Sequence, residues 1–469
     1  MISIKNSNEK TKQNFILFTE ESWLKSKSDF HEAGRFFSAK KNEFFVLVEH
    51  DTINYLIGIG GENQADYNWS QVAQKFSAQF KDKFIATETL VSGSFNKLQF
   101  SSFYKGLFLG TYDYPFDKNH PFWKDDFVIY TDKIDETEIK NLTEETEALC
   151  YGQFAGMEWL NKPANLKTAA LLSFFLAEQA HILKINYKSL DRKACRREGM
   201  GAYLAVNNGS SQDAAFTILE YNCGNPNAKT IGLVGKCVLF DTGGISVKGA
   251  QNMHYMKSDI GGAAAVMGAL FAAAKLKSAV NIVAILPITD NVISNESYLP
   301  SDVVTACNGK TIEILNTDAE GRLTLADGLA YMTKNYKTDI LIDLATLTGS
   351  AVRMFGNTCA PYFSNNEDLR MRLEKSANKT GQKIWNMPLW EIWEEDFKSD
   401  VADLKNISMK PYGDCIIAAK FVEQFTANHP CWAHLDIAGV AFDNVNYAKE
   451  KAATGYGVEL LVDFIKEMD

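Results

Sequence analysis

The chain has 469 residues, of which 46% are apolar, so it is long enough to form more than one hydrophobic core. Its formal net charge of -10 argues against a nucleic-acid-binding surface, which would normally be basic. We find neither a signal-like N-terminus nor an apolar run of membrane-spanning length, and we therefore expect a cytoplasmic protein that does not cross a membrane.

Residues 1–145 are predicted to form a small α/β domain. Apolar runs at 15–18, 44–48 and 55–59 alternate with polar stretches that suit helices or turns. None of these runs gathers titratable residues into a catalytic pattern. The segment 134–147 is rich in Asp, Glu, Lys and Thr, as a connecting segment or an exposed helix would be, so we place the domain boundary there.

Residues 146–469 alternate helix-like and strand-like segments, which predicts a larger domain with a mostly parallel central sheet covered by helices on both faces. The expected strands are 215–221, 230–240, 279–288, 339–344 and 433–437, and the expected helices are 169–177, 261–276, 323–335 and 415–428. Segment 199–206 is predicted to be a glycine-hinged turn leading into a strand. In such a sheet, ligands bind beyond the carboxyl ends of the strands.

The run NTDAEGR at 316–322 places two carboxylates and a guanidinium between a strand-like and a helix-like segment. Side chains two positions apart in extended chain point the same way, so Asp318 and Glu320 can converge on one point. Convergent carboxylates repel each other unless a cation lies between them, and divalent metals accept such oxygen ligands. The alternative is an ordinary capping turn at a helix N-terminus.

Two more aspartates have a similar setting. Asp241 ends a buried strand-like run and is followed by the turn-forming pair Gly243 and Gly244, whereas Asp259 precedes an alanine-rich helix. Four converging carboxylates are enough for two divalent ions that share bridging oxygens, as in two-metal hydrolases. The eight cysteines lack zinc-site spacing and the seven histidines include no H-E-x-x-H, so a metal site would depend mainly on carboxylates.

Both clusters, in this order and spacing, resemble the leucyl aminopeptidase family, the cytosolic two-metal aminopeptidases that share the NTDAEGR signature. The resemblance extends through DLATLTG at 343–349, HLDIAG at 434–439 and ATGYGV at 453–458, and it is weak over the first 140 or so residues. It implies a metal-dependent aminopeptidase that uses a metal-activated water to remove apolar, leucine-like N-terminal residues from peptides. It also implies zinc or manganese, a homohexamer, and an N-terminal domain used in subunit packing.

The metal ligands implied by the resemblance are Lys236, Asp241, Asp259, Asp318 and Glu320. In the family pattern, Asp241 and Glu320 bridge the two metals, Asp318 completes one site, and Asp259 with the Lys236 amine completes the other. Only a neutral amine coordinates a metal, so burial and two cations would have to lower the pKa of Lys236 strongly. The alternative for Lys236 is a salt bridge with a nearby carboxylate.

Two further residues are implied in catalysis. Lys248 would support the substrate carbonyl and its developing negative charge, and Arg322 would hold a bicarbonate ion that acts as general base. The alternatives are an exposed lysine and an ion pair between Arg322 and Asp318 or Glu320. The residues implied in substrate binding are Met256, Asn316, Thr346, Leu347 and Gly349. Met256 by itself would be interpreted as a core residue.

Three departures from the family pattern bear on selectivity. Cys237 would alter metal choice if its sulfur approached the ions, Arg353 would alter substrate preference at the cleft mouth, and His254 is expected behind the ligands or at the surface. A dipeptidase or amino-acid amidase with the same site is the alternative enzyme. A non-catalytic metal-binding or DNA-associated scaffold is the alternative from another class, and the intact ligands and the acidic charge argue against it.

Overall fold

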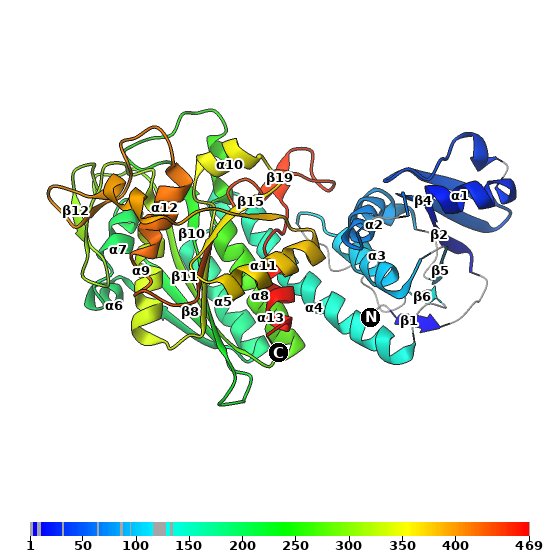
Figure 1. Cartoon of the computed structure of the whole chain (residues 1–469), viewed down its shortest axis with the longest axis horizontal. Coiled ribbons are helices and arrows are strands. Elements are labelled where there is room, and N and C mark those ends of the chain that lie inside the picture. The colour runs from blue at the N-terminus through cyan, green and yellow to red at the C-terminus, as the bar shows by residue number, and fades with distance from the viewer. Residues whose placement is uncertain are drawn as a thin grey trace. The chain divides into compact units, whose positions relative to one another are not determined.

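The computed structural model describes residues 3–6, 11–30, 32–62, 65–84, 88–93, 95–115, 128–131 and 135–468 (Figure 1). The chain divides into one compact unit of residues 1–150 and 446–449 and another of residues 151–445 and 450–469. The predicted α/β architecture, with a small N-terminal and a larger C-terminal domain, is confirmed. The boundary between the two units falls inside helix α4 (Glu136–Asn161). Residues 136–147 of the charged segment therefore form the start of this helix and are not an extended linker.

The smaller unit contains a six-stranded sheet of order β1-β6-β5-β2-β4-β3, in which β3 and β4 pair antiparallel and the other pairs are parallel. Its strands are β1 (Ser3–Asn6), β2 (Gln13–Thr19), β3 (Phe44–Glu49), β4 (Thr52–Gly60), β5 (Glu88–Gly93) and β6 (Val128–Thr131), and its helices include α1 (Glu20–Ser26), α2 (Tyr67–Phe80) and α3 (Lys97–Leu109). Buried Phe15 of β2 packs edge-on against Phe76 of α2 and joins helix to sheet.

The larger unit contains a nine-stranded sheet of order β16-β15-β18-β14-β9-β11-β8-β7, with β10 also paired to β11. The strands are β7 (Asn186–Leu190), β8 (Ala215–Tyr221), β9 (Thr230–Gly235), β10 (Cys237–Asp241), β11 (Asn281–Asn291), β14 (Ile340–Ala345), β15 (Ala360–Ser364), β16 (Ile384–Asn386) and β18 (Trp432–Asp436). Its central pairs are parallel and antiparallel pairs lie toward both edges, so the predicted mostly parallel sheet is confirmed.

Helices pack on both faces of this sheet because side chains alternate along each strand. At Gly235 of β9, a Cβ would lie 2.7 Å from Ala263 of α8 (Gly261–Leu276), whereas the preceding Val234 contacts Gly328 of α9 (Glu320–Asn335). The remaining helices of the unit are α5 (Ala169–Leu183), α6 (Arg192–Arg197), α7 (Gly201–Asn207), α10 (Gly349–Phe355), α11 (Glu367–Thr380), α12 (Asp414–Glu423) and α13 (Val458–Lys466). Two small sheets are added, one of β12 (Val303–Thr305), β13 (Thr311–Glu313) and β17 (Leu404–Lys405), the other of β19 (Phe442–Asn444) and β20 (Lys451–Ala453).

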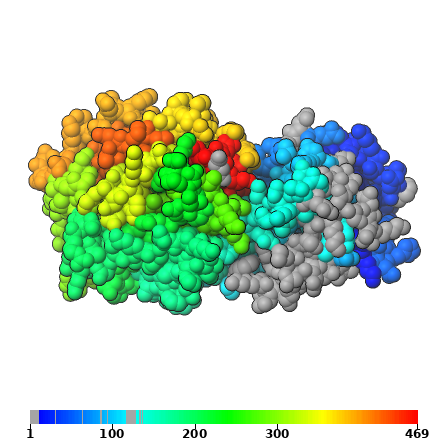
Figure 2. All heavy atoms as spheres, turned by 90° about the horizontal axis from the view of Figure 1, so that it is seen from below, coloured from blue at the N-terminus to red at the C-terminus, as the bar shows by residue number. Residues whose placement is uncertain are grey.

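Helix α8 is the apolar centre of the larger unit. The segment Met253–Leu276 is long and apolar enough to cross a membrane by length and composition, yet 89% of its most apolar window is buried inside the protein. A core helix of a soluble domain has these properties. In Figure 2, turquoise and green residues from the earlier segments of this unit form the lower part of its face, and yellow and orange residues from later segments form the upper part.

Two sequence-based predictions differ from the structure. The single strand expected at 230–240 is two strands, β9 and β10, because the carbonyl of Lys236 accepts a hydrogen bond from Ala263 in α8 and so leaves the sheet. The strand expected near 199–206 is helix α7, whose first turn is capped by a buried carboxylate when the Tyr203 N–H donates to Asp327. The capping residue lies far away in sequence, so no local pattern indicates it.

The packing of α8 against α4 depends on glycine. A Cβ at Gly152 would lie 2.0 Å from the carbonyl oxygen of Gly268, so the two helices approach backbone to backbone. We expect Gly152→Val to destabilise the larger unit by about 3 kcal/mol, because the overlap falls on backbone that cannot move cheaply. Urea unfolding measures this. Gly249→Val is the control, because no atom lies within 4 Å of its added Cβ, and an equal loss in both variants would contradict the prediction.

Candidate metal centre

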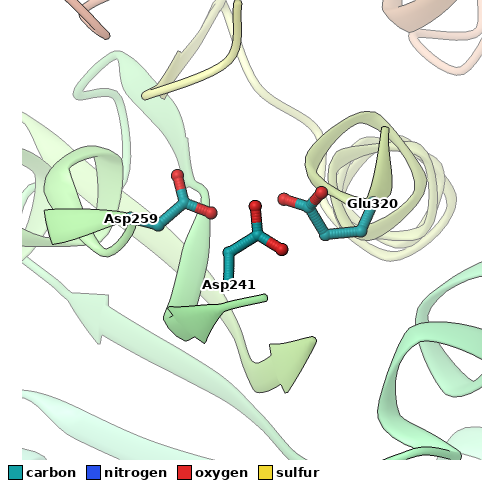
Figure 3. A group of neighbouring side chains, drawn as sticks. All are labelled: Asp241, Asp259 and Glu320. Atoms are coloured by element: carbon teal, nitrogen blue, oxygen red, sulfur yellow. The ribbon is translucent and has the colours of Figure 1, made fainter. Parts of the chain in front are cut away.

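Three buried carboxylates converge beyond the carboxyl end of the central sheet. Asp241 ends β10, Asp259 lies two residues before the start of α8 and Glu320 is the first residue of α9. At least one oxygen of each lies within 4.8 Å of the other two, and Figure 3 shows the three carboxylates pointing toward one another. Their residues are 2%, 7% and 1% exposed, so water cannot dissipate the repulsion.

Two lysines partly neutralise this cluster. Lys236, which follows β9, places its Nζ 2.8 Å from Asp259 Oδ2 and 2.8 Å from Glu320 Oε1. Lys248, from the glycine turn after β10, lies 2.7 Å from Asp241 Oδ2 and also contacts Asp318 Oδ1. The structure therefore brings together the four carboxylates singled out in the sequence. Lys236 forms the salt bridges that were the alternative to metal coordination.

The proton affinities follow from burial and charge. Burial alone would lower the pKa of Lys236, but the charges of Asp259 and Glu320 outweigh it and the pKa lies above its ordinary value. Lys248 is shifted in the same direction, because Asp241 and Glu320 outweigh its burial. Burial, together with the charge of Asp241, raises the pKa of Asp318 to about 6. The cluster thus favours bound cations, whether protons or metals.

The donor set fits divalent metal ions. Asp259 Oδ2, Asp318 Oδ1 and Glu320 Oε1 are buried and accept no well-formed hydrogen bond within the described part of the chain. Their oxygens instead lie beside ammonium groups, at distances of an ion pair. Carboxylate oxygens that are held only by ion pairs and share one buried space are suitable ligands for hard or borderline divalent cations.

Backbone and amide groups that the sequence analysis missed fix the orientation of the carboxylates. Asn291, at the end of β11, donates from Nδ2 to Asp241 Oδ1 at 2.8 Å and to the Thr317 carbonyl at 2.9 Å. Asn406 donates to the Asn316 carbonyl at 2.7 Å, and the Asn316 side chain accepts from the Asp318 N–H at 2.8 Å. Asn316 therefore shapes the signature turn. The only sequence signal for Asn291 is a polar residue ending an apolar strand.

The residues predicted to bind substrate lie in three segments beside the carboxylates, namely the turn with Met256, the signature turn with Asn316, and residues 346–349 after β14. Thr346, just after β14, donates from Oγ1 to Asp259 Oδ1 at 2.7 Å, and its carbonyl accepts from Lys236 at 2.8 Å. Gly349 begins α10 three residues later. Half-buried Met256 lies in the 3-10 turn Met253–Ser258, and its carbonyl accepts from the Asp259 N–H at 3.3 Å.

Buried Asp436, which the sequence analysis did not single out, holds the segment after β14 in place. It accepts from the Leu347 N–H at 3.1 Å and from Thr348 Oγ1 at 2.6 Å. The Ala438 N–H also donates to it at 3.2 Å. A substrate contact at Leu347 would therefore use its carbonyl, because its N–H is already engaged.

Arg322 is buried in the first turn of α9. Its Nη1 donates to the Asn406 carbonyl at 2.8 Å, and its Nη2 lies 3.5 Å from Asp414 Oδ1. The ion-pair partner is thus Asp414, whereas the sequence analysis considered Asp318 or Glu320. Burial lowers the pKa of Arg322, and Asp414 opposes that shift.

The three residues that depart from the family pattern lie in different surroundings. Cys237 is fully buried in β10, where burial raises its thiol pKa, and it is absent from the carboxylate cluster among the described residues. His254 is exposed and its ring packs 4.0 Å from Tyr255, in line with a surface histidine. The exposed side chain of Arg353 folds back toward Gly349. A Cβ added at Gly349 would lie 3.4 Å from Nη1 of Arg353.

Comparison with known proteins decides the family. The model of the "cytosol aminopeptidase family, catalytic domain" matches residues 156–462. The chain belongs to the cytosol aminopeptidase family. That membership places it among the metal-dependent aminopeptidases, a class of hydrolases, and it confirms the resemblance seen in the sequence. Residues 1–150, which form most of the smaller unit, lie outside the matched segment.

Individual relatives agree with this assignment. The chain is 46% identical over 314 residues to a probable cytosol aminopeptidase of Chlorobaculum parvum, which covers 67% of this chain and 62% of that protein. A probable cytosol aminopeptidase of Chlorobium limicola is 39% identical over 78% of this chain and 75% of its own length. The first of these alignments spans less than two thirds of the relative.

Solved structures of family-like proteins cover nearly the whole chain. A tomato leucine aminopeptidase mutant superposes with a TM-score of 0.88 and 31% identity, covering 99% of this chain and 96% of that one. The bottromycin maturation enzyme BotP, in complex with Mn, has a TM-score of 0.86 and 26% identity, covering 97% of this chain and 99% of that one.

The position of Lys236 depends on the absence of a side chain at Gly321. A Cβ there would lie 2.5 Å from Lys236 Cε and 2.6 Å from its Nζ. We expect Gly321→Ala to displace the flexible end of Lys236 at little cost in stability and to weaken metal binding about tenfold or more. Titration with Mn²⁺ or Zn²⁺ followed by calorimetry measures this.

Gly328→Ala is the matched control, because it adds the same methyl to the same helix against Val234 rather than Lys236. Its metal affinity should equal that of the wild type. Unchanged affinity in Gly321→Ala would show that the placement of Lys236 does not matter for the metal centre.

Proposed function

We propose that this protein is an aminopeptidase that hydrolyses N-terminal, preferably apolar residues from peptides with the help of two divalent metal ions. The observation that carries the proposal is the convergence of Asp241, Asp259 and Glu320, with Lys236 and Lys248 beside them, at the carboxyl end of the sheet. Family membership supports the reaction class. Family membership leaves the preferred residue open, so that preference rests on the resemblance.

The residues that would hold the metals are Lys236, Asp241, Asp259, Asp318 and Glu320. By the resemblance, Asp241 and Glu320 would contribute to both metal sites. When bound, two divalent cations polarise the scissile carbonyl and activate a water molecule. Lys236 would become a ligand only after losing its proton, a loss that neighbouring cations favour by repelling the ammonium charge. Zinc and manganese are the proposed ions, and the manganese complex of BotP supports the latter.

Other residues of the chain would position the substrate. Lys248, whose ion pair with Asp241 favours its protonated form, would stabilise negative charge that develops on the carbonyl oxygen. Arg322 would hold an oxyanion, which the resemblance identifies as bicarbonate, because a guanidinium grips planar anions through two N–H groups. Met256, Asn316, Thr346, Leu347 and Gly349 are proposed to contact the first residue of the substrate.

Assembly and location follow the family in this proposal. We propose a cytosolic homohexamer, in which residues 1–145 serve subunit packing and residues 146–469 form the catalytic domain. The names of the curated relatives support a cytosolic location. Light scattering would test the assembly, with a particle of six 52.4 kDa chains as the expected result and a stable monomer as the contrary one.

The activity is tested by hydrolysis of leucyl-para-nitroanilide after metal stripping and reconstitution with Zn²⁺ or Mn²⁺. We expect metal-dependent release that Glu320→Gln lowers by about a hundredfold or more, because the variant removes the negative charge of a proposed metal ligand. An N-acetylated substrate should be resistant, since the free amine is needed for recognition. Dipeptides and amino-acid amides complete the panel, and absence of hydrolysis across all of them with either metal would refute the proposal.

Lys248 can be tested separately from the metal ligands. Lys248→Met keeps the length of the side chain but removes its charge, so we expect kcat to fall by about 10²- to 10³-fold, as for loss of one oxyanion-stabilising donor. Metal content, measured by atomic emission, should stay the same. Lys229→Met, at a position before β9 and outside the centre, is the control for loss of a lysine. A normal kcat in Lys248→Met would contradict the assigned role.

A further inference from the structure

The surface loop 407–413 begins and ends beside the candidate metal centre. Asn406, immediately before it, donates to the Asn316 carbonyl at 2.7 Å, and its own carbonyl accepts from Arg322 Nη1 at 2.8 Å. Asp414, immediately after it, lies 3.5 Å from Arg322 Nη2. Both ends of the loop are therefore held by the same buried arginine in the first turn of α9.

The short length of the loop keeps all of it near the centre. An extended chain advances by about 3.3–3.6 Å per residue, so the Cα of Met409 lies within about 11 Å of that of Asn406, and the Cα of Tyr412 within about 7 Å of that of Asp414. A bound peptide in extended form advances at the same rate. The residues that follow its scissile bond could therefore reach the loop.

The loop and the proposed contacts of the first substrate residue lie on different sides of the centre. Thr346 Oγ1 donates to Asp259 Oδ1 at 2.7 Å, and the Met256 carbonyl accepts from the Asp259 N–H at 3.3 Å, so these two residues gather on the side of α8. The loop is attached through Arg322 to α9, which packs on the opposite face of the sheet. A peptide whose first residue lies on the α8 side would direct its later residues toward the loop.

The loop presents apolar side chains to solvent. Met409 is 75% exposed and Tyr412 is 60% exposed, and Pro411 between them is exposed as well. Covering such side chains with apolar groups of a partner is favourable, because it removes apolar surface from water. Single exposed apolar residues are common, but a group of them at the rim of a candidate site is typical of a ligand-contacting surface.

Contacts behind the loop hold it in shape. Lys410 Nζ forms an ion pair with buried Asp396 of the 3-10 helix Glu391–Phe397, and it lies 5.9 Å from the centre of the Tyr412 ring. Pro411 has a fixed φ and restricts Lys410 before it to extended conformations. A surface that is ordered before binding loses little conformational entropy when a ligand covers it.

We propose that loop 407–413 binds the part of the peptide that follows the scissile bond, and that Met409 and Tyr412 select an apolar side chain at one of the first three positions there. The inference rests on the proposed aminopeptidase function and extends it beyond the first residue. It makes oligopeptides the substrate class, because amino-acid amides have no residue to place on the loop. Binding energy from these remote contacts would raise kcat/KM.

The test measures kcat/KM of the metal-loaded enzyme for Leu-Gly-Gly-Gly and for the three peptides in which phenylalanine replaces one of the glycines. We expect the wild type to prefer at least one phenylalanine peptide by about tenfold, the size of effect that one hydrophobic contact has on selectivity. Met409→Ser or Tyr412→Ser should lower this ratio by about threefold or more, and the double variant should bring it close to one. Because the ratio is taken within each protein, a general loss of active enzyme does not change it.

Two further variants show whether the apolar character of the loop is responsible. Met371→Ser is the matched control, because Met371 is an exposed methionine on α11, outside the loop. Its ratio should equal that of the wild type. Met409→Leu keeps an apolar side chain of similar volume and should retain about half of the preference or more.

A binding measurement gives a second readout that does not depend on turnover. The preferred phenylalanine peptide and Leu-Gly-Gly-Gly are each prepared with the first peptide bond reduced to CH2–NH, which cannot be hydrolysed. Calorimetry with the metal-loaded wild type should show tighter binding of the phenylalanine analogue. The two analogues should bind the double variant Met409→Ser, Tyr412→Ser with nearly equal Kd.

Equal kcat/KM of the wild type for all four peptides, or an unchanged preference in the double variant, would overturn the inference while leaving the aminopeptidase proposal intact. A smaller assembly of the double variant in light scattering, with its preference unchanged, would assign the loop to subunit contact and would also overturn it. Absence of hydrolysis of every peptide and of leucinamide by the wild type would refute the proposed function, and this inference with it.

Discussion

The structure of the catalytic unit depends on one electrostatic constraint, the enforced proximity of Asp241, Asp259, Asp318 and Glu320. Two lysines face these four carboxylates, so the centre keeps an excess of negative charge in surroundings from which water is largely excluded. Such an arrangement is unfavourable for folding by itself, and the surrounding hydrogen bonds hold it together. Proteins retain such costly sites where cations must be bound with both strength and defined geometry.

This proximity arises at the carboxyl end of the parallel strands, where elements that cover the two opposite faces of the sheet converge. Helix α8 covers one face and is preceded by Asp259, and α9 covers the other and begins with Glu320. Lys236, at the end of the strand between them, contacts both acids. This convergence requires small residues at the crossing points, since a Cβ at Gly262 would lie 2.0 Å from the Leu344 carbonyl oxygen. The glycines of the centre are thus needed for helix packing as much as for turns.

The sequence predicted most of this centre because its acids end or begin regular elements. Asp241, Asp259 and Glu320 were placed at the correct ends of a strand and two helices, and the parallel sheet followed from the alternation of elements. What it did not predict are contacts between distant segments. Asn291, Asp414 and Asp436 carry no motif of their own, and the capping of α7 by Asp327 reverses a local strand preference. Tertiary hydrogen bonds of this kind overrule local propensity, and a single sequence does not record them.

The burial of α8 also sets an order for biogenesis. This helix is apolar on all sides, and the contact of Gly268 with Val458 shows that α13, formed by a much later segment, completes its cover. When α8 has left the ribosome and α13 has not yet been synthesised, the nascent chain therefore exposes an apolar surface that binds chaperones or aggregates. The catalytic unit can acquire its native core only after synthesis of residues 458–466, and cleavage ahead of them would leave a polypeptide prone to degradation.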